Sequence, residues 1–485
     1  MQDQQQPALK TPLAIVYIVI VAALCLVPSV GLLFGGLEES SDSDAAPEPR
    51  MTNDDGSVNF NVLADAGDWF DDHFAFRNEW VTAAAFVEGG LFGVSSNDGV
   101  VYGTDGWLYY GDSVDDFRGT DQLNDRQLYD IAHSAALVQK HALSRGIDFA
   151  FMISPNKNTL YGQNMPYYYQ VDVGDSNLER IAPMLQAEGV NYVDARKLIR
   201  EATAHLLSEG SVDGSWNQAS TDNTGISDGE VLYHKRDSHW NNKGAALVAD
   251  ALMTSLGHAH RDYATETYSV RDDFSGDLDK MLFPSAPTPE AEVYYDTQQQ
   301  FEYVTENVQS NFDPKIQTAS TAVGATGSLV MYRDSFCNSL LPFMAEAYDQ
   351  AYFSRAVPYQ LSIDLAAHDA DALIIERAQR FMRDMAANAP VMPAPMLLEG
   401  DAPTSGYREL QDVNERVQGE YLLVTGDIPD AVEAGDRIAI RLNGTLVYEA
   451  FGMSDSETSQ EGFQLLVPTS IALESGNTYE LCLFK

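Results

Sequence analysis

The chain has 485 residues, of which 45% are hydrophobic and 10% aromatic, and its formal net charge is −43 at pH 7. This length allows two or three domains with cores of their own, and the apolar content is that of a globular protein. The negative charge excludes nucleic acid as a partner, because binding to a phosphate backbone requires basic surface. A polyanionic substrate would need a local basic patch that acts against the field of the whole chain.

Three cysteines are present, at Cys25, Cys337 and Cys482. Their spacing fits neither a disulfide framework nor a metal site. One bridge, between Cys337 and Cys482, stays open as an alternative to free thiols. We expect no metal ion and no cofactor.

An uncharged run at residues 12–36 opens the chain and is long enough for a bilayer crossing, which takes about 20 residues as a helix. Lys10 lies before this run, and a stretch rich in Ser, Asp, Glu and Pro follows it at 37–58. The positive-inside rule then places the N-terminus in the cytoplasm and the remainder outside. No small-residue cleavage site follows in good position, which favours an uncleaved anchor over the alternative of a removed signal peptide. We predict a membrane anchor at 1–36, a flexible acidic stalk at 37–58, and a single-pass cell-membrane protein with an extracytoplasmic catalytic domain.

Strand and helix patterns alternate through residues 59–385, which we predict as one catalytic domain. The patterns predict, in chain order, two short strands around a turn at 104–106, a helix at 124–146, a buried strand from 147, a helix at 177–189, a strand and a helix at 190–202, a helix at 243–257, a strand, turn and helix at 327–348, and a strand from 370. This alternation is typical of an α/β fold with a mostly parallel sheet and helices on both faces. Residues 258–326 lack the pattern and are predicted as an irregular insertion.

The composition changes at 386–404, where Ala and Pro accumulate, and we predict a linker there. Residues 405–485 contain short alternating runs that are typical of strands, and the pair Asn443-Gly444 is a strong hairpin signal. The sequence therefore predicts a small C-terminal domain of the β-sandwich type.

Two polar motifs stand at predicted junctions between a loop and a helix. The first is "RDSHWNNKG" at 236–244, with Asp237 and His239, and the second is "LVMYRDSFCNS" at 329–339, with Ser335. Ser335 follows an apolar strand and opens a helix, which places its hydroxyl at the carboxyl edge of the sheet, where open α/β folds have their sites. A serine hydroxyl is a weak nucleophile that needs a base, and the base needs an acid to orient it. We predict Ser335 as nucleophile, His239 as base and Asp237 as the orienting acid.

Each motif alone has a structural alternative. Asp334 and Ser335 are residue types that cap helices, here the helix expected from Phe336, and Asp237 with Ser238 can cap the next helix in the same way. Two such motifs in one α/β domain favour the catalytic interpretation over coincidence.

The motifs "DSHWNNKGA" and "YRDSFCNSLLPFMAEAY", with the upstream segments "VYGTDGWLYYGD" (101–112) and "ISPNKNTLY" (153–161), resemble the SGNH-hydrolase-like proteins of the alginate O-acetyltransferase type. They are also similar to relatives of these proteins named for an Asp-His-His-Trp motif. The resemblance covers residues 65–385 and implies an SGNH/flavodoxin-like fold. Two departures stand out, because Ser238 stands where the naming motif has His and Arg333 where Gly is common.

The resemblance implies acyl transfer through an acetyl-serine intermediate. The acceptor would be an extracellular or cell-wall polysaccharide, and the acetyl group would come from a membrane-bound O-acyltransferase. One alternative is a carbohydrate deacetylase or esterase, in which water takes the acyl group from the same serine. Another is a non-catalytic glycan-binding scaffold. The C-terminal domain would bind glycan or a partner protein.

Further candidates for substrate contact or oxyanion stabilisation, beside the backbone N–H of Ser335, are Asn156, Lys157, Arg333, Asn338 and Trp240. Capping of a turn or helix is the alternative for the two asparagines, a salt bridge for Lys157, and core packing for Trp240. Glu376 and Arg377, at the end of a predicted strand, either support the site or form an ion pair with each other.

Overall fold

The computed structural model describes residues 11–33, 46–53, 56–169, 174–203, 231–296, 299–429, 431–455, 458, 460–472 and 476–485. The chain divides into two compact units, of which the first comprises Met1–Gly111 with Ser275–Glu290, and the second comprises Asp112–Phe274 with Ala291–Lys485. This division differs from the predicted domain boundaries, since residues 59–111 fall in the first unit.

The first unit contains α1 (Thr11–Leu33), α2 (Val62–His73), α3 (Arg77–Phe92), β1 (Val100–Tyr102), β2 (Leu108–Tyr110) and α11 (Asp277–Leu282). The strands β1 and β2 pair antiparallel, as the sequence predicts. Asp105 and Gly106 in the turn have positive φ angles of 54° and 78°, and an Asp-Gly pair suits that backbone. Leu108 packs with Leu278 and Phe283 in the core of this unit.

The N-terminal helix α1 covers most of the predicted anchor. The transmembrane helix predicted at 12–36 is not found, since no helix among the described residues is both long enough and apolar enough to cross a membrane. The last turn of α1 also packs within the first unit, because a Cβ on Gly31 would lie 2.2 Å from the Cβ of Ala75. Only glycine permits this approach.

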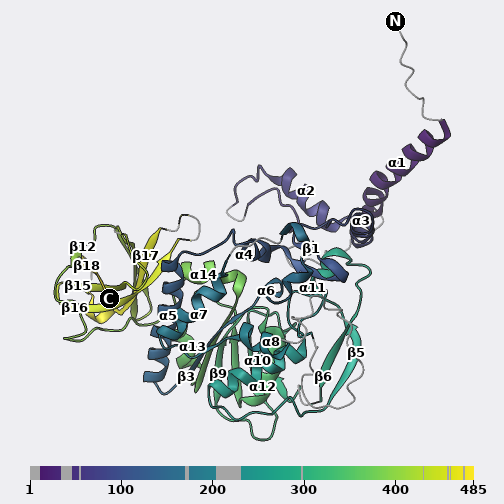
Figure 1. Ribbon diagram of the computed structural model, residues 1–485. Helices are drawn as coiled ribbons and strands as arrows, with labels where there is room; N and C mark the ends of the chain where they lie inside the picture. The colour runs from purple at the N-terminus through teal and green to yellow at the C-terminus, as the bar shows by residue number, and fades with distance from the viewer. Residues whose placement is uncertain are drawn as a thin grey trace. The chain divides into compact units, whose positions relative to one another are not determined.

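The second unit is built on a seven-stranded sheet (Figure 1). Its spatial order is β4 (Tyr192–Val193), β3 (Asp148–Ser154), β11 (Ala372–Ala378), β9 (Ser328–Tyr332), β10 (Gln350–Ser354), β8 (Lys315–Ser320) and β7 (Phe301–Tyr303). The first five strands are parallel. At one edge β8 pairs antiparallel with β10, and β7 pairs antiparallel with β8, so that β8 alone runs against the other six strands. The predicted α/β fold with a mostly parallel sheet is thus the one observed.

The region predicted as an irregular insertion, 258–326, contains regular strands. It provides both β7 and β8 at the edge of the main sheet. It also provides β5 (Tyr268–Phe274) and β6 (Glu290–Tyr295), which pair with each other. The prediction of an irregular insertion is therefore wrong for the part of this region that the structure describes.

The helices of the second unit are α4 (Val114–Phe117), α5 (Asp125–Ser144), α6 (Lys157–Tyr161), α7 (Asn177–Ala187), α8 (Ala195–Ala202), α10 (Asn242–Ser255), α12 (Cys337–Ala347), α13 (Leu361–Ala367) and α14 (Met382–Ala387). Val330 of β9 and Ile375 of β11 lie in one buried cluster with residues of α5, α7, α13 and α14. Met331 points to the opposite face, and its sulfur lies 3.7 Å from Sγ of Cys337 in α12. Helices therefore cover both faces. Cys337 and Cys482 are free thiols, so the bridge left open by the sequence does not form.

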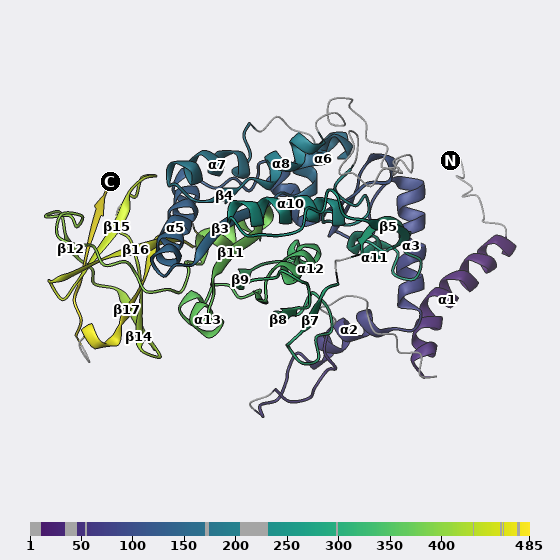
Figure 2. The ribbon, with the colours of Figure 1, turned by 90° about the horizontal axis from the view of Figure 1, so that it is seen from below.

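The C-terminal part is one antiparallel sheet, in the order β12 (Arg408–Glu409), β18 (Tyr479–Phe484), β15 (Arg437–Leu442), β16 (Leu446–Ser454), β17 (Glu461–Pro468), β14 (Tyr421–Asp427) and β13 (Val413–Gln418) (Figure 2). Val424, Ile440 and Leu481, from three of these strands, share one buried cluster. The sheet curls around that cluster and forms a half-barrel. The predicted β-sandwich is thus wrong in detail, because alternation predicts strands but does not show whether their inner faces belong to one sheet or two.

The segment predicted as a linker, 386–404, makes backbone hydrogen bonds both to the α/β part of the chain and to the C-terminal sheet. The N–H of Val391 donates to the carbonyl of Tyr359 at 2.9 Å, and the N–H of Ala394 donates to the carbonyl of Leu466 at 2.9 Å. The chain therefore passes into the C-terminal sheet through a segment held by backbone hydrogen bonds.

Candidate active site

Ser335 lies in a tight turn between β9, which ends at Tyr332, and α12, which begins at Cys337. Asp334 shapes this turn, since its Oδ1 accepts the N–H of Phe336 at 2.9 Å and its Oδ2 accepts the N–H of Ala378 at 2.5 Å. The carboxylate of Asp334 therefore serves the start of the helix, since Phe336, the residue before α12, makes no side-chain cap hydrogen bond. The Ser335 hydroxyl is thereby left for a different contact.

The segment before α10 carries the other motif. Asn241 caps α10, because its side chain accepts the N–H of Gly244 at 3.0 Å. Capping by Asp237 and Ser238, the structural alternative, is therefore not observed. Asp237 Oδ1 instead accepts the backbone N–H of His239 at 2.9 Å, which closes a small loop and turns the imidazole toward the carboxylate.

The structure brings Ser335, His239 and Asp237 together, although the two motifs are 96 residues apart in sequence. His239 Nε2 lies 2.8 Å from Ser335 Oγ, and His239 Nδ1 lies 2.8 Å from Asp237 Oδ1. With the proton on Nδ1, the imidazole donates to Asp237 and accepts the Ser335 hydroxyl proton, which is the arrangement for base-assisted attack. Asp237 is buried while His239 and Ser335 are half-buried, so a substrate has access to the hydroxyl.

Arg380 also contacts the proposed nucleophile and was not among the sequence candidates. Its Nη2 donates to Ser335 Oγ at 3.3 Å. Arg380 lies two residues beyond β11, the strand beside β9, at the same carboxyl edge of the sheet as Ser335. The rule that sites collect at this edge could have pointed to it, but the order of strands was needed to apply the rule.

Glu376 lies under the Ser335 turn and is fully buried. Its Oε1 accepts the Ser154 hydroxyl at 2.6 Å, and its Oε2 accepts the N–H of Asp334 at 3.0 Å. Burial and the neighbouring Asp334 carboxylate raise the pKa of Glu376 to about 8. Glu376 is therefore mainly protonated at neutral pH, and it supports the turn. The ion-pair partner of Arg377 is Asp384, at 2.9 Å, whereas the sequence left open a pair between Arg377 and Glu376 as one of two alternatives.

Lys157 and Asn156 begin the helix after β3. The Lys157 ammonium donates to the carbonyls of His234, Lys235 and Asp237, at 3.2, 3.0 and 2.5 Å. Lys157 thus holds the loop that carries the Asp237 carboxylate.

The Asn156 side chain belongs to a buried polar cluster around Asp116. Its amide nitrogen donates to Asp116 Oδ2 at 3.3 Å, and Gln379 Nε2 donates to the same oxygen at 2.5 Å. Burial raises the pKa of Asp116 to about 6, against the lowering effect of these hydrogen bonds. The amide N–H contact seen here is with Asp116, and the oxyanion role of Asn156 stays a prediction.

The remaining candidates are mostly inside the protein. Arg333 is only 1% exposed, and its guanidinium donates to Asn338 Oδ1 and to the carbonyl of Asp313, both at 2.9 Å. Arg355 donates to the same Asn338 oxygen at 3.1 Å. Trp240 is 1% exposed, which makes it a core residue. The substrate contacts predicted for Arg333, Asn338 and Trp240 stay predictions.

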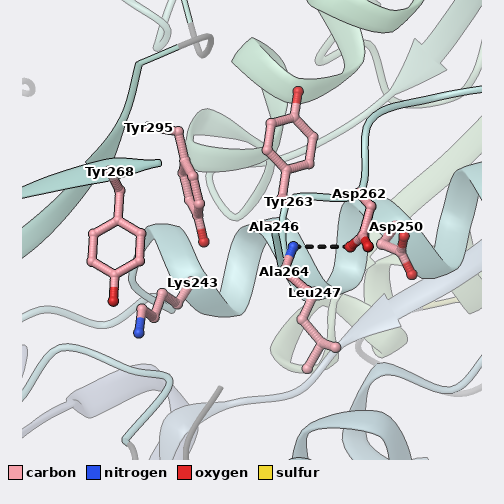
Figure 3. Close-up of a pocket in the computed structure, with 9 residues that line it drawn as sticks. All are labelled: Lys243, Ala246, Leu247, Asp250, Asp262, Tyr263, Ala264, Tyr268 and Tyr295. Atoms are coloured by element: carbon pink, nitrogen blue, oxygen red, sulfur yellow. Dashed lines mark hydrogen bonds between the residues drawn. The ribbon is translucent and has the colours of Figure 1, made fainter. Parts of the chain in front are cut away.

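A separate cavity of about 100 Å³ lies along α10 (Figure 3). Rings of Tyr263, Tyr268 and Tyr295 line it, and Lys243 Nζ lies 4.8 Å from the centre of the Tyr268 ring. No residue predicted for the active site lines this cavity.

Fold and site geometry together describe an α/β domain with a Ser-His-Asp arrangement at the carboxyl edge of a mostly parallel sheet. Residues 100–208 match the family described as SGNH hydrolase-like domain, acetyltransferase AlgX. This match confirms the resemblance predicted from the motifs and agrees with the enzyme class predicted from it, an SGNH-like O-acetyltransferase. It includes Asn156 and Lys157 and ends before both motifs of the proposed triad. No curated protein sequence matches the chain.

Solved structures show more distant similarity. Bacillus cereus PatB1 is 13% identical with a TM-score of 0.42, over 58% of this chain and 96% of that one. A DHHW family protein from Eubacterium siraeum is 16% identical with a TM-score of 0.36, over 58% and 94%. Pseudomonas aeruginosa AlgX is 12% identical with a TM-score of 0.33, over 79% and 94%. TM-scores this low carry no inference about function.

Proposed function

We propose that the protein is a serine O-acetyltransferase that acetylates hydroxyl groups of a polysaccharide. The observation that carries this proposal is the continuous hydrogen-bonded chain from Asp237 through His239 to Ser335, with both bonds at 2.8 Å. These lengths lie within the range of about 2.6–3.2 Å that proton transfer between a nucleophile and its base requires. The same lengths speak against the alternative of a non-catalytic scaffold.

In the first half of the reaction, Ser335 Oγ forms a bond to the carbonyl carbon of an acetyl donor, and its proton passes to His239 Nε2. The tetrahedral intermediate then expels the donor's leaving group, which takes the proton back from His239. The product is an acetyl ester on Ser335. Asp237 keeps the imidazole in the required tautomer and stabilises the transient imidazolium.

In the second half, an acceptor hydroxyl gives its proton to His239 and attacks the acetyl-serine carbonyl. Collapse of the second intermediate breaks the bond to Ser335 Oγ, and the proton returns from His239 to this oxygen. The acceptor leaves as an acetate ester. If water takes the place of the acceptor, the same steps release acetate, which is the esterase alternative.

The cellular setting is part of the proposal and rests on the sequence. The uncharged run at 12–36 with Lys10 before it supports a position at the cell membrane, with the catalytic part outside the cytoplasm. There the acceptor is an extracellular or cell-wall polysaccharide, and a membrane-bound O-acyltransferase supplies the acetyl group. Protease treatment of intact cells tests this orientation, because a cytoplasmic catalytic part would stay protected.

The experiment that tests the chemistry is mass spectrometry after incubation with an activated acetyl ester. An acetyl adduct on the peptide that contains Ser335 is expected in the wild type and absent from Ser335→Ala. Adduct decay is then followed with and without oligosaccharide. Decay that accelerates with the sugar and yields acetylated sugar supports the transferase; decay to acetate at one rate in both samples supports the esterase.

A further inference from the structure

The proposed reaction places negative charge on the substrate carbonyl oxygen, in a site that already contains carboxylates. Asp237 and Asp334 both lie within the hydrogen-bond network around Ser335, and the whole chain carries a charge of −43. A developing oxyanion at this place needs a donor, and a positively charged donor in a partly buried site is worth most.

Lys157 and Asn156, which the sequence offered as oxyanion donors, donate hydrogen bonds to other groups. The Lys157 ammonium is directed at three backbone carbonyls of the loop that carries Asp237. The amide of Asn156 donates to Asp116. By contrast, the Arg380 guanidinium donates directly to Ser335 Oγ, at 3.3 Å.

Aromatic rings hold the Arg380 guanidinium in place. Its central carbon lies 5.5 Å from the centre of the Phe336 ring and 5.1 Å from that of Phe381, within the range of cation–π attraction. The His239 imidazole contacts the same Phe336 ring edge to face, with centroids 4.8 Å apart. One ring therefore positions both groups that hydrogen-bond to Ser335.

We propose that Arg380 is a further catalytic residue, which stabilises the negative charge that forms when Ser335 attacks the acetyl carbonyl. This inference rests on the proposed function. In the resting site Ser335 Oγ donates its proton toward His239 and accepts from Arg380, which favours the deprotonated oxygen. Once Oγ is bonded to the carbonyl carbon, the oxyanion is separated from Oγ by one bond angle and comes within reach of the same guanidinium. Arg380 keeps its protons throughout.

The test compares Arg380→Met with the wild type in pre-steady-state acetylation of Ser335 by an activated acetyl ester. Methionine keeps an apolar stem against Phe336 and removes the charge. We expect the acetylation rate to fall by about 100-fold or more, as it does when other enzymes lose one oxyanion donor, with little change in KM. Arg380→Lys should recover part of the rate, and added ethylguanidinium should recover part of it in Arg380→Ala.

Arg383→Ala is the matched control. Arg383 lies three residues away and pairs with Asp121, so its loss should leave the rate at the wild-type value. A folded Arg380→Met variant that acetylates Ser335 at the wild-type rate would overturn the role of Arg380 while the proposed function stands. A wild type that forms no acetyl-Ser335 would overturn both.

Discussion

The indole N–H of Trp240 donates to the backbone carbonyl of Phe336 at 3.1 Å. Each residue directly follows a proposed catalytic residue, His239 in one case and Ser335 in the other. This hydrogen bond therefore links the two motifs directly beside His239 and Ser335. The rings of Trp240 and Phe336 also contact edge to face, with centroids 4.8 Å apart.

Trp240→Phe should lower catalysis more than it lowers stability. The substitution keeps an apolar ring but leaves the buried carbonyl of Phe336 without its donor, at a cost of about 1–3 kcal/mol. Because that carbonyl adjoins the Ser335 turn, the distance from Ser335 to His239 should become longer and less uniform. The rate of Ser335 acetylation and the unfolding midpoint are measured together.

Trp80→Phe is the control for this change, because the Trp80 indole nitrogen has no hydrogen-bond partner among the described residues. Its acetylation rate should equal that of the wild type. Equal rates in Trp240→Phe and Trp80→Phe would show that the bond to Phe336 does not position the site.

Lys157→Met should loosen the loop that carries Asp237. Three carbonyls lose a charged donor at once, and a hydrogen bond to a charged group contributes about 1.5–3 kcal/mol. We expect a lower free energy of unfolding in urea and faster amide hydrogen exchange in residues 234–239. Lys197→Met, at a side chain that is 68% exposed, is the control and should match the wild type in both measurements. Unchanged exchange in the loop would contradict the role assigned to Lys157.

The raised pKa of Glu376 predicts how the stability of the protein depends on pH. Its pKa is raised from 4.5 to about 8 in the folded protein, so between these values the folded state holds a proton that the unfolded state has released. The free energy of unfolding contributed by this group therefore falls as pH rises from about 4.5 to about 8, and levels off above that.

Glu376→Gln should remove this dependence, because glutamine is neutral at every pH. The free energy of unfolding of the variant, relative to the wild type, is expected to increase steadily between pH 4.5 and pH 8. Urea unfolding at a series of pH values measures it, with the exposed Glu302→Gln as a control that shows no such trend. A constant difference between variant and wild type across this range would mean that Glu376 is ionised in the folded protein.

Local patterns predicted the parts of the site that depend on one stretch of chain. Ser335 at a strand-to-helix turn and His239 beside Asp237 each follow from residue types at short spacing, and the structure places them within hydrogen-bond distance. Glu376 reaches the N–H of Asp334, and Arg380 reaches Ser335, only because β11 pairs with β9, and nothing in either strand's own sequence specifies that neighbour.

The same limit explains the errors in the fold. Residues 315–320, "KIQTAS", form β8 by pairing with β10, although their own pattern is weak, because the neighbouring strand supplies the hydrogen bonds. The Asn443-Gly444 turn was predictable. Both residues adopt positive φ angles, 51° and 71°, and asparagine and glycine are the residue types that favour such angles. Whether the strands on each side of such a turn curl into one sheet depends on packing across the whole domain.

The variant Ser335→Ala distinguishes a catalytic role of Ser335 from a purely structural role. A capping serine would cost about 0.5–2 kcal/mol when replaced by alanine, but Asp334 accepts the N–H of Phe336 at the start of α12 and the Ser335 hydroxyl is bonded to His239, so the unfolding midpoint should stay close to that of the wild type. The acetyl-enzyme cannot form without Oγ, and loss of a triad nucleophile typically lowers turnover by several orders of magnitude. Acetate release from a chromogenic ester and thermal melting are measured on the same samples.

Ser339→Ala, one turn further along α12, is the matched control and should keep both activity and stability. Ser335→Cys adds a second arm, because a thiolate still accepts an acetyl group and would show a trapped thioester by mass spectrometry. Wild-type turnover by Ser335→Ala would contradict the covalent mechanism, since Ser335 supplies the hydroxyl that is bonded to His239 Nε2. A large drop in melting temperature without loss of turnover would instead assign Ser335 to the fold, and the hydrogen bond to His239 would then be a packing contact.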